Sequence, residues 1–220
     1  MQRRLLPIVC LALPAYLGLL ACSPGDKGPA GTPEAKTYAL TGFTSVNAET
    51  GIKLKLSQGP FAVSAESKNG DLSRLKVELR GEELSVSSDS HFTFGASPLY
   101  AVSVTAPTYK AIHATAGVAI EGDGLALEDL SVAISAGVDA RLSGVCKSLT
   151  ASVSAGASLR AEKLKCAAAT VTASAGAVAD VYASERATIS ASAGAKVSVD
   201  GHPPVVEKTA DIAAVIEVKN

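Results

Sequence analysis

Apolar and polar residues alternate along the chain from residue 112 to residue 201. Every second position is apolar in five similar stretches, which follow one another at intervals of 18–20 residues. Side chains alternate across a β-strand, so the apolar sets predict five strand segments that share one buried side. The predicted inward sets are Ile112, Ala114, Ala116, Val118 and Ile120, then alternate residues of 132–142, 151–161, 171–181 and 189–199.

One glycine marks each of these stretches and fixes the length of the repeat. A fixed period of this length is typical of a β-solenoid, in which each turn buries its apolar side by stacking on its neighbours. A repeated corner explains the glycines, because glycine adopts positive φ without steric cost. The alternative is a flat strand that passes straight through each glycine. The glycines are Gly117, Gly137, Gly156, Gly176 and Gly194.

The segment before the repeats also has the pattern of β-structure. Short alternating strands, such as Ile52–Leu56 and Leu75–Leu79, are separated by turn residues at intervals typical of all-β proteins. We therefore predict one all-β domain over residues 38–220, with the glycine-marked repeats at 112–201 and a terminal strand or cap after residue 204. Phe92 and Phe94, in a loop that breaks the pattern, are either core anchors or an exposed apolar tip.

The outward positions of the repeats are rich in hydroxyl side chains, which makes them the candidate interaction face. A regular hydroxyl ladder suits contact with a glycan, a partner protein or ice. The alternative is that serine and threonine are simply small polar residues that tolerate close stacking on a solvated sheet. The predicted column is Thr115, Ser135, Ser154, Ser174 and Ser192, and Ser152, Thr172 and Ser190 run beside it.

Two cysteines occupy equivalent positions on adjacent repeats. Cys146 and Cys166 each precede a repeat glycine by ten residues, as do Leu127 and Ser184. Stacked neighbours lie within the Cα separation that a disulfide needs, so Cys146 and Cys166 are a candidate pair. Two buried free thiols would also pack at these positions.

The N-terminus has the features of an export signal. Arg3 and Arg4 precede an apolar run, and the sequence Leu19-Leu20-Ala21-Cys22 resembles the lipobox of bacterial lipoproteins. This resemblance implies a signal peptide over residues 1–21, lipidation of Cys22 and attachment to the membrane, with Ser23 favouring the outer membrane. The alternative is an ordinary secretory signal. Residues 22–37, rich in proline, glycine and charge, predict a flexible tether.

Composition and motifs argue against several classes of function. The net charge is −1, with 20 basic and 21 acidic residues, so we expect no nucleic-acid partner. No nucleophile motif, phosphate loop or metal-ligand spacing is present, so we predict no catalytic residue, no metal and no cofactor. The outward column Glu121, Arg141, Arg160 and Asp180 predicts a ladder of ion pairs, although a carbohydrate-active enzyme remains an alternative.

Several short motifs in order resemble a known family. They are Phe43-Thr44-Ser45-Val46, Gly51-Ile52, Leu84-Ser85-Val86, Val104-Thr105-Ala106-Pro107, the Ser-Ala-Gly blocks and Gly201-His202-Pro203. Together they resemble the auto-transporter adhesin head domain of bacterial envelope lipoproteins, also called the head GIN domain, over residues 38–218.

This resemblance implies a right-handed, single-stranded parallel β-helix with no shared catalytic residues. The expected function is that of a non-enzymatic, lipid-anchored envelope protein that acts as an adhesin-like module on a glycan or an envelope protein. The alternatives are a carbohydrate-active β-helix enzyme and a purely structural envelope lipoprotein.

Overall fold

The computed structural model describes residues 34–68, 70–89 and 99–219, which form strands, turns and bends. The predicted signal peptide, Cys22, Phe92 and Phe94 lie outside these residues. The strands are β1 (Glu34–Tyr38), β2 (Ser45–Glu49), β3 (Ile52–Gln58), β4 (Ala62–Ser67), β5 (Leu75–Arg80), β6 (Glu83–Ser88), β7 (Tyr100–Ala106), β8 (Ala111–Thr115), β9 (Ala119–Ile134), β10 (Asp139–Val153), β11 (Ser158–Ala173), β12 (Val178–Ala191), β13 (Lys196–Asp200), β14 (Val205–Ala210) and β15 (Val215–Val218).

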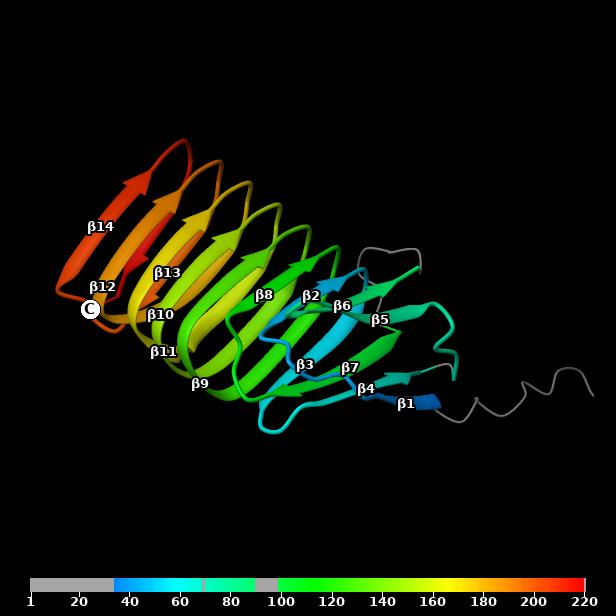
Figure 1. The fold of residues 1–220 in the computed structure, drawn as a ribbon. Helices are drawn as coiled ribbons and strands as arrows, with labels where there is room; N and C mark the ends of the chain where they lie inside the picture. Colours follow the sequence, from blue (N-terminus) through cyan, green and yellow to red (C-terminus); the bar gives the residue numbers. More distant parts are fainter. Residues whose placement is uncertain (1–33, 69, 90–98, 220) are drawn as a thin grey trace, which may run out of the picture. The chain divides into compact units, whose positions relative to one another are not determined.

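Most strands pair in parallel and stack into a β-solenoid of about five turns (Figure 1). The long strands β9 to β12 bend, so that the first half of each lies in one parallel row and the second half in another. Equivalent residues on successive turns are Ala119, Asp139, Ser158, Val178, Lys196 and Val215, which are 18–20 residues apart. The structure thus confirms the predicted solenoid and its period.

Each repeat glycine lies at a corner of the coil, together with the alanine before it. In the five repeats the φ of the alanine is 48–57° and that of the glycine is 69–75°, both in the left-handed region. The glycine N–H donates to the carbonyl of the equivalent corner on the next turn, for example from Gly156 to Ala175 at 3.0 Å. The glycines therefore mark corners rather than flat strands.

The prediction that alternation runs straight through each corner is wrong at one position per turn. Ala136, Ala155, Ala175 and Ala193 are exposed and Ala116 is half-buried, because their backbone turns outward at the corner. The buried residues on the two sides of a corner are separated by an even number of positions, so the alternation in the sequence continues unbroken across the corner. For this reason the sequence alone does not reveal the interruption.

The order of turns at the N-terminal end differs from the order of the sequence. The turn formed by β2 and β3 lies between the β6–β7 turn and the β8–β9 turn. Gln58 fixes this crossing: its side chain exchanges hydrogen bonds with the backbone of Ala126, at 2.6 and 2.8 Å, and donates to the Pro107 carbonyl. The buried Tyr109 hydroxyl lies 2.8 Å from the Ser57 carbonyl, and burial raises the pKa of this phenol.

Antiparallel strands cover the N-terminal end of the coil. β4 pairs with β7 and β1, and β5 pairs with β6. Since β1 begins at Glu34, the last residues of the predicted tether, 34–37, belong to the folded domain. The described part of the chain contains no helix with the length and apolar character of a membrane span.

The interior changes in character along the coil. Large side chains such as Phe43, Tyr109 and Leu84 fill the N-terminal turns, whereas alanine and valine predominate in the later ones, beside a few larger residues such as Leu159 and Leu164. Cys146 and Cys166 are paired in register, face this interior and form a disulfide. Their column continues to Ala183 and not to the predicted Ser184, because the register shifts between Cys166 and Ala168, where the next turn is shorter.

The C-terminal end of the coil is a strand edge. β14 pairs only with β12, and β15 pairs only with β13, within the described residues. Ion pairs hold this last turn to the turn before it: Arg186–Glu207, Lys196–Glu217 and Lys219–Asp200. Lys208 stands in register with Ile189, in the inward column, and is exposed. An inward-pointing charge on an edge strand opposes pairing with another chain.

We predict that the disulfide stabilises the solenoid by lowering the conformational entropy of the unfolded chain. The pair closes a loop of 20 residues, which in the chain-entropy model is worth about 3 kcal/mol. A Cys146→Ala/Cys166→Ala variant should unfold at a lower urea concentration, and reductant should shift the unchanged protein by a similar amount. Identical urea midpoints for the two proteins without reductant would rule out this contribution.

We also predict that Lys208 keeps the open end from associating. Replacing it by isoleucine extends the apolar inward column to the edge, so Lys208→Ile should form dimers or longer assemblies as concentration rises. Sedimentation velocity measures this. Thr209→Ile is the matched control, since it adds an apolar side chain to the outward side of the same strand. Equal sedimentation of the two variants would contradict the role of Lys208.

Candidate functional site

The second halves of the long strands carry a flat array of hydroxyl side chains. Register aligns Ser131, Thr150, Thr170 and Thr188 in one row, and Ser152, Thr172 and Ser190 in the next. A third row follows each strand at the corner. We call the whole set the hydroxyl face: Thr115, Ser131, Ser135, Thr150, Ser152, Ser154, Thr170, Thr172, Ser174, Thr188, Ser190 and Ser192.

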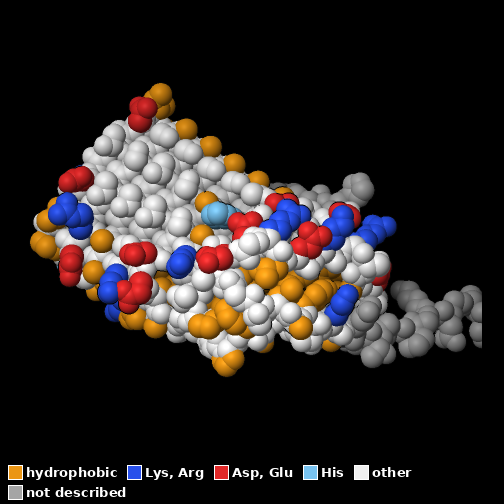
Figure 2. All heavy atoms as spheres, viewed as in Figure 1, with side chains coloured by type: hydrophobic (Ala, Val, Ile, Leu, Met, Phe, Trp, Pro, Cys, Tyr) orange, Lys and Arg blue, Asp and Glu red, His pale blue; other side chains and the backbone are white. Residues whose placement is uncertain are grey.

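The side-chain hydroxyls of this face make no hydrogen bond to another protein group in the described part of the chain. The middle row is that of Ser152, Thr172 and Ser190, and its position on β9 is Ala133. Ala133 is the one member of this row, across β9 to β12, that lacks a hydroxyl. Figure 2 shows this region as a broad surface free of charged side chains, bordered by a row of hydrophobic ones along the corners. The face can therefore donate and accept hydrogen bonds in a regular array.

The five residues predicted from the sequence form the border of this face. Thr115 ends β8 and is exposed, whereas Ser135, Ser154, Ser174 and Ser192 follow their strands and are half-buried. The carbonyls of the last three accept the N–H that closes the corner, for example from Ala157 to Ser154 at 3.1 Å. Their backbone thus shapes the corner while their side chains edge the face.

The sequence prediction missed the row of Ser131, Thr150, Thr170 and Thr188. These residues have the same outward parity as the predicted column and lie four residues before it, so the signal was present in the sequence. What the sequence does not show is that the strand bends before this row, which places it on the same flat side as the corner serines.

The charged column lies on the first halves of the strands, away from the hydroxyl face. Its members are in register as predicted, but they do not pair along the column. Asp139 instead contacts both arginines, at 3.2 Å from Arg141 and 3.1 Å from Arg160, and Glu121 pairs with Lys53 on the preceding turn. These contacts are largely exposed, so each contributes little to stability.

Asp180, the last member of this column, lies near the acidic side chain of Glu162. Partial burial, and then the charge of Glu162, raises the pKa of Asp180 above its usual value. One carboxylate oxygen of Glu162 is buried without a hydrogen-bond partner. No group of three or more histidine, cysteine or acidic side chains within the described ranges is arranged to hold a metal ion.

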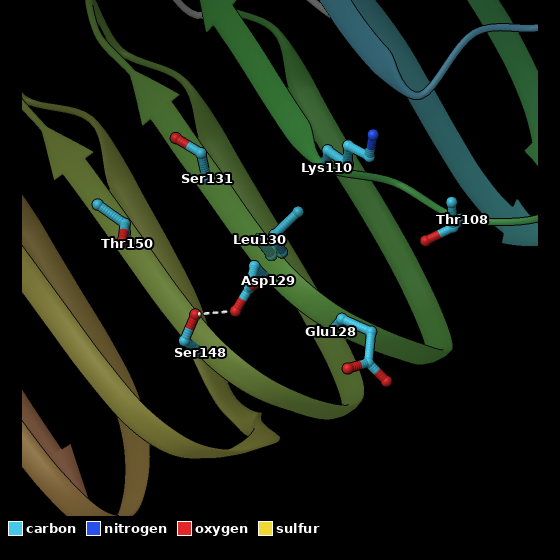
Figure 3. Close-up of a pocket in the computed structure, with 8 residues that line it drawn as sticks. All are labelled: Thr108, Lys110, Glu128, Asp129, Leu130, Ser131, Ser148 and Thr150. Carbon is cyan, nitrogen blue, oxygen red and sulfur yellow. Dashed lines mark hydrogen bonds between the residues drawn. The ribbon is translucent and has the colours of Figure 1, made fainter.

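A pocket lined mostly by residues with polar or charged end groups adjoins the hydroxyl face where β9 and β10 bend (Figure 3). Its cavity volume is about 420 Å³, and Leu130 lies between Lys110 and Asp129. Ser148 donates to one oxygen of Asp129 at 2.5 Å, and Glu128 pairs with Lys147. We call this the β9–β10 pocket, lined by Thr108, Lys110, Glu128, Asp129, Leu130, Ser131, Ser148 and Thr150.

The stacked corners, the apolar interior and the flat polar side define a β-solenoid that presents a repetitive surface. The family model described as "Putative auto-transporter adhesin, head GIN domain" matches residues 42–203. The chain belongs to this family, as its short motifs predicted. No curated protein matches the chain in sequence.

Solved structures share the fold at low sequence identity. The crystal structure of a "putative adhesin" from Bacteroides fragilis superposes with a TM-score of 0.63 at 14% identity, covering 87% of this chain and 99% of that one. That of a "Putative lipid binding protein" from Parabacteroides distasonis has a TM-score of 0.51 at 12% identity, with coverage of 86% and 98%. These similarities show a common fold.

The raised pKa of Asp180 predicts a defined pH dependence. Because the folded state holds this proton more tightly than the unfolded state, stability falls as the pH rises from about 3.8 to the raised pKa of the folded state, and is constant above it. Asp180→Asn should therefore raise the urea midpoint at pH 7, and the gain should nearly vanish at pH 4. Asp139→Asn is the control, since it removes two arginine contacts and should give no gain at pH 7. An Asp180→Asn variant no more stable than the original at pH 7 would contradict the prediction.

Proposed function

We propose that this protein is a non-enzymatic, adhesin-like module of the bacterial cell envelope that contacts its partner through the hydroxyl face. The observation that carries the proposal is the array of unpaired hydroxyl groups held in register over four successive turns. Strand spacing repeats these groups at about 4.8 Å across the strands and roughly 6.7 Å along them. A repetitive partner, such as a glycan, suits a repetitive surface better than a partner of irregular shape.

The size of the face sets the kind of binding it supports. The rows on β9 to β12 span about 14 Å across the strands and about 13 Å along them. This area, roughly 200 Å², is well below the ~800 Å² that each partner buries in a stable protein complex. A single contact would thus be weak, and firm attachment would depend on many copies acting together on one surface.

The proposed anchor supplies that multiplicity. A lipid on Cys22 would confine many copies to the outer membrane, with residues 23–33 as the tether between lipid and solenoid. The lipobox-like sequence Leu19-Leu20-Ala21-Cys22 supports this proposal. Lateral concentration in a membrane raises the effective concentration of weak contacts and gives avidity without a larger interface.

The chemistry of the hydroxyl face favours a polar partner over a lipid, although the Parabacteroides distasonis protein of similar fold carries the name of a lipid binding protein. An acyl chain needs an apolar lining, whereas the outward rows consist of serine and threonine. The ion pairs beside the charged column support a structural role for these charges, because the Asp139 carboxylate contacts both Arg141 and Arg160.

A bulky charge on the hydroxyl face should abolish attachment without unfolding the protein. Ser190→Arg places a long cation in the middle row, which should prevent close approach of a partner surface. Adhesion of cells that express the chain, or of beads that carry it, to glycan-coated and cell surfaces measures the effect. Ser184→Arg is the matched control, because Ser184 is also exposed on β12 but lies at the bend before the face.

Unaltered adhesion of the Ser190→Arg protein, with a normal urea midpoint, would exclude this face as the contact surface. Equal loss in the Ser184→Arg protein would show that the effect of arginine is not specific to the face.

A further inference from the structure

We propose that the β9–β10 pocket binds one uncharged sugar unit of the glycan that the hydroxyl face contacts. The inference rests on the proposed function and adds to it a specific subsite with a defined chemistry. The pocket adjoins the flat array, and Ser131 and Thr150 belong to both. A chain of sugars lying on the face can therefore place one unit in the pocket.

The pocket offers acceptors and donors at opposite sides. Asp129 accepts a hydrogen bond from Ser148 through one oxygen, which fixes its carboxylate and leaves the second oxygen available to a ligand hydroxyl. The Lys110 side chain forms no hydrogen bond or ion pair with the described residues and has three N–H donors. Sugar hydroxyls donate and accept at once, so a sugar can meet both kinds of group.

The backbone of both residues and the carboxylate of Asp129 are held in place before any ligand arrives. The Lys110 N–H donates to the Thr44 carbonyl at 2.7 Å, and the Lys110 carbonyl accepts from Ser131 at 2.8 Å. Lys110 is thus tied to the turns on both sides of it. Asp129 is fixed by its register with Ser148 and by the bond between their side chains. Such preorganisation reduces the entropy lost on binding.

Charge and lining select the class of ligand. Glu128 is paired with Lys147, so the remaining charges, on Lys110 and Asp129, cancel. A net neutral pocket favours an uncharged polyol over a phosphate, a uronic acid or a cation. Leu130 is the one large apolar residue of the lining. The cavity of about 420 Å³ is at the small end of the range for ligand pockets.

The test measures binding of the full-length protein to immobilised neutral oligosaccharides of glucose, galactose, mannose and N-acetylglucosamine. Asp129→Asn keeps the shape and can still accept from Ser148, but it removes the charge that strengthens a bond to the ligand. We expect its affinity for the bound glycan to fall about tenfold or more. Lys110→Met should give a similar loss, because it keeps the length of the side chain and removes the donors.

The matched control is Asp123→Asn, which makes the same change at an exposed acid outside this pocket and should bind like the unchanged protein. If Ser190→Arg abolishes adhesion while Asp129→Asn and Lys110→Met bind every glycan normally, the pocket is not a subsite and the hydroxyl face stands. If the protein adheres to cells but binds none of the neutral oligosaccharides, the sugar assignment is overturned and the proposed function stands. If the Ser190→Arg variant and the pocket variants all adhere normally, both the hydroxyl face and the pocket are excluded as contact sites.

Discussion

The structure depends on one repeated corner, at which two consecutive residues adopt left-handed backbone angles. An alanine in this conformation costs about 1 kcal/mol, whereas glycine adopts it freely. The corner is retained because each glycine N–H donates to the carbonyl of the corner on the next turn, as from Gly117 to Ala136 and from Gly176 to Ala193. Every corner thus supports its neighbour, and stacking the corners fixes the register of all the strands between them.

That register explains both the interior and the surface. It brings Cys146 opposite Cys166 within the core, and it aligns Thr150, Thr170 and Thr188 on the outside. The same backbone constraint that builds an apolar column therefore builds a polar one. The regularity of the hydroxyl face follows from the fold. The unpaired state of the hydroxyls and the adjoining pocket make the stronger argument for a functional surface.

The repeats could be predicted because their contacts are local: residues of one turn pair with residues 17–20 positions away, and the sequence keeps a period close to this. The N-terminal turns could not, since residues distant in sequence determine their order. Nothing near Gln58 indicates that its amide reaches Ala126, 68 residues later. The pocket was not predicted although Lys110 and Asp129 lie on neighbouring turns, because the sequence does not show where the strands bend. Within the charged column, the sequence predicted the alignment of Arg141 with Arg160 but not that Asp139 bridges them.

The crossed order of the first turns has a consequence for how the molecule assembles. The β2–β3 turn is enclosed only when the chain has extended past β9, so the N-terminal end requires cooperation among segments far apart in sequence. Each later turn needs only the turn before it. The slow, entropically costly step is thus confined to the N-terminal half, and the remaining turns can add in succession on the completed template. A polypeptide that crosses a membrane N-terminus first would present these parts in that same order.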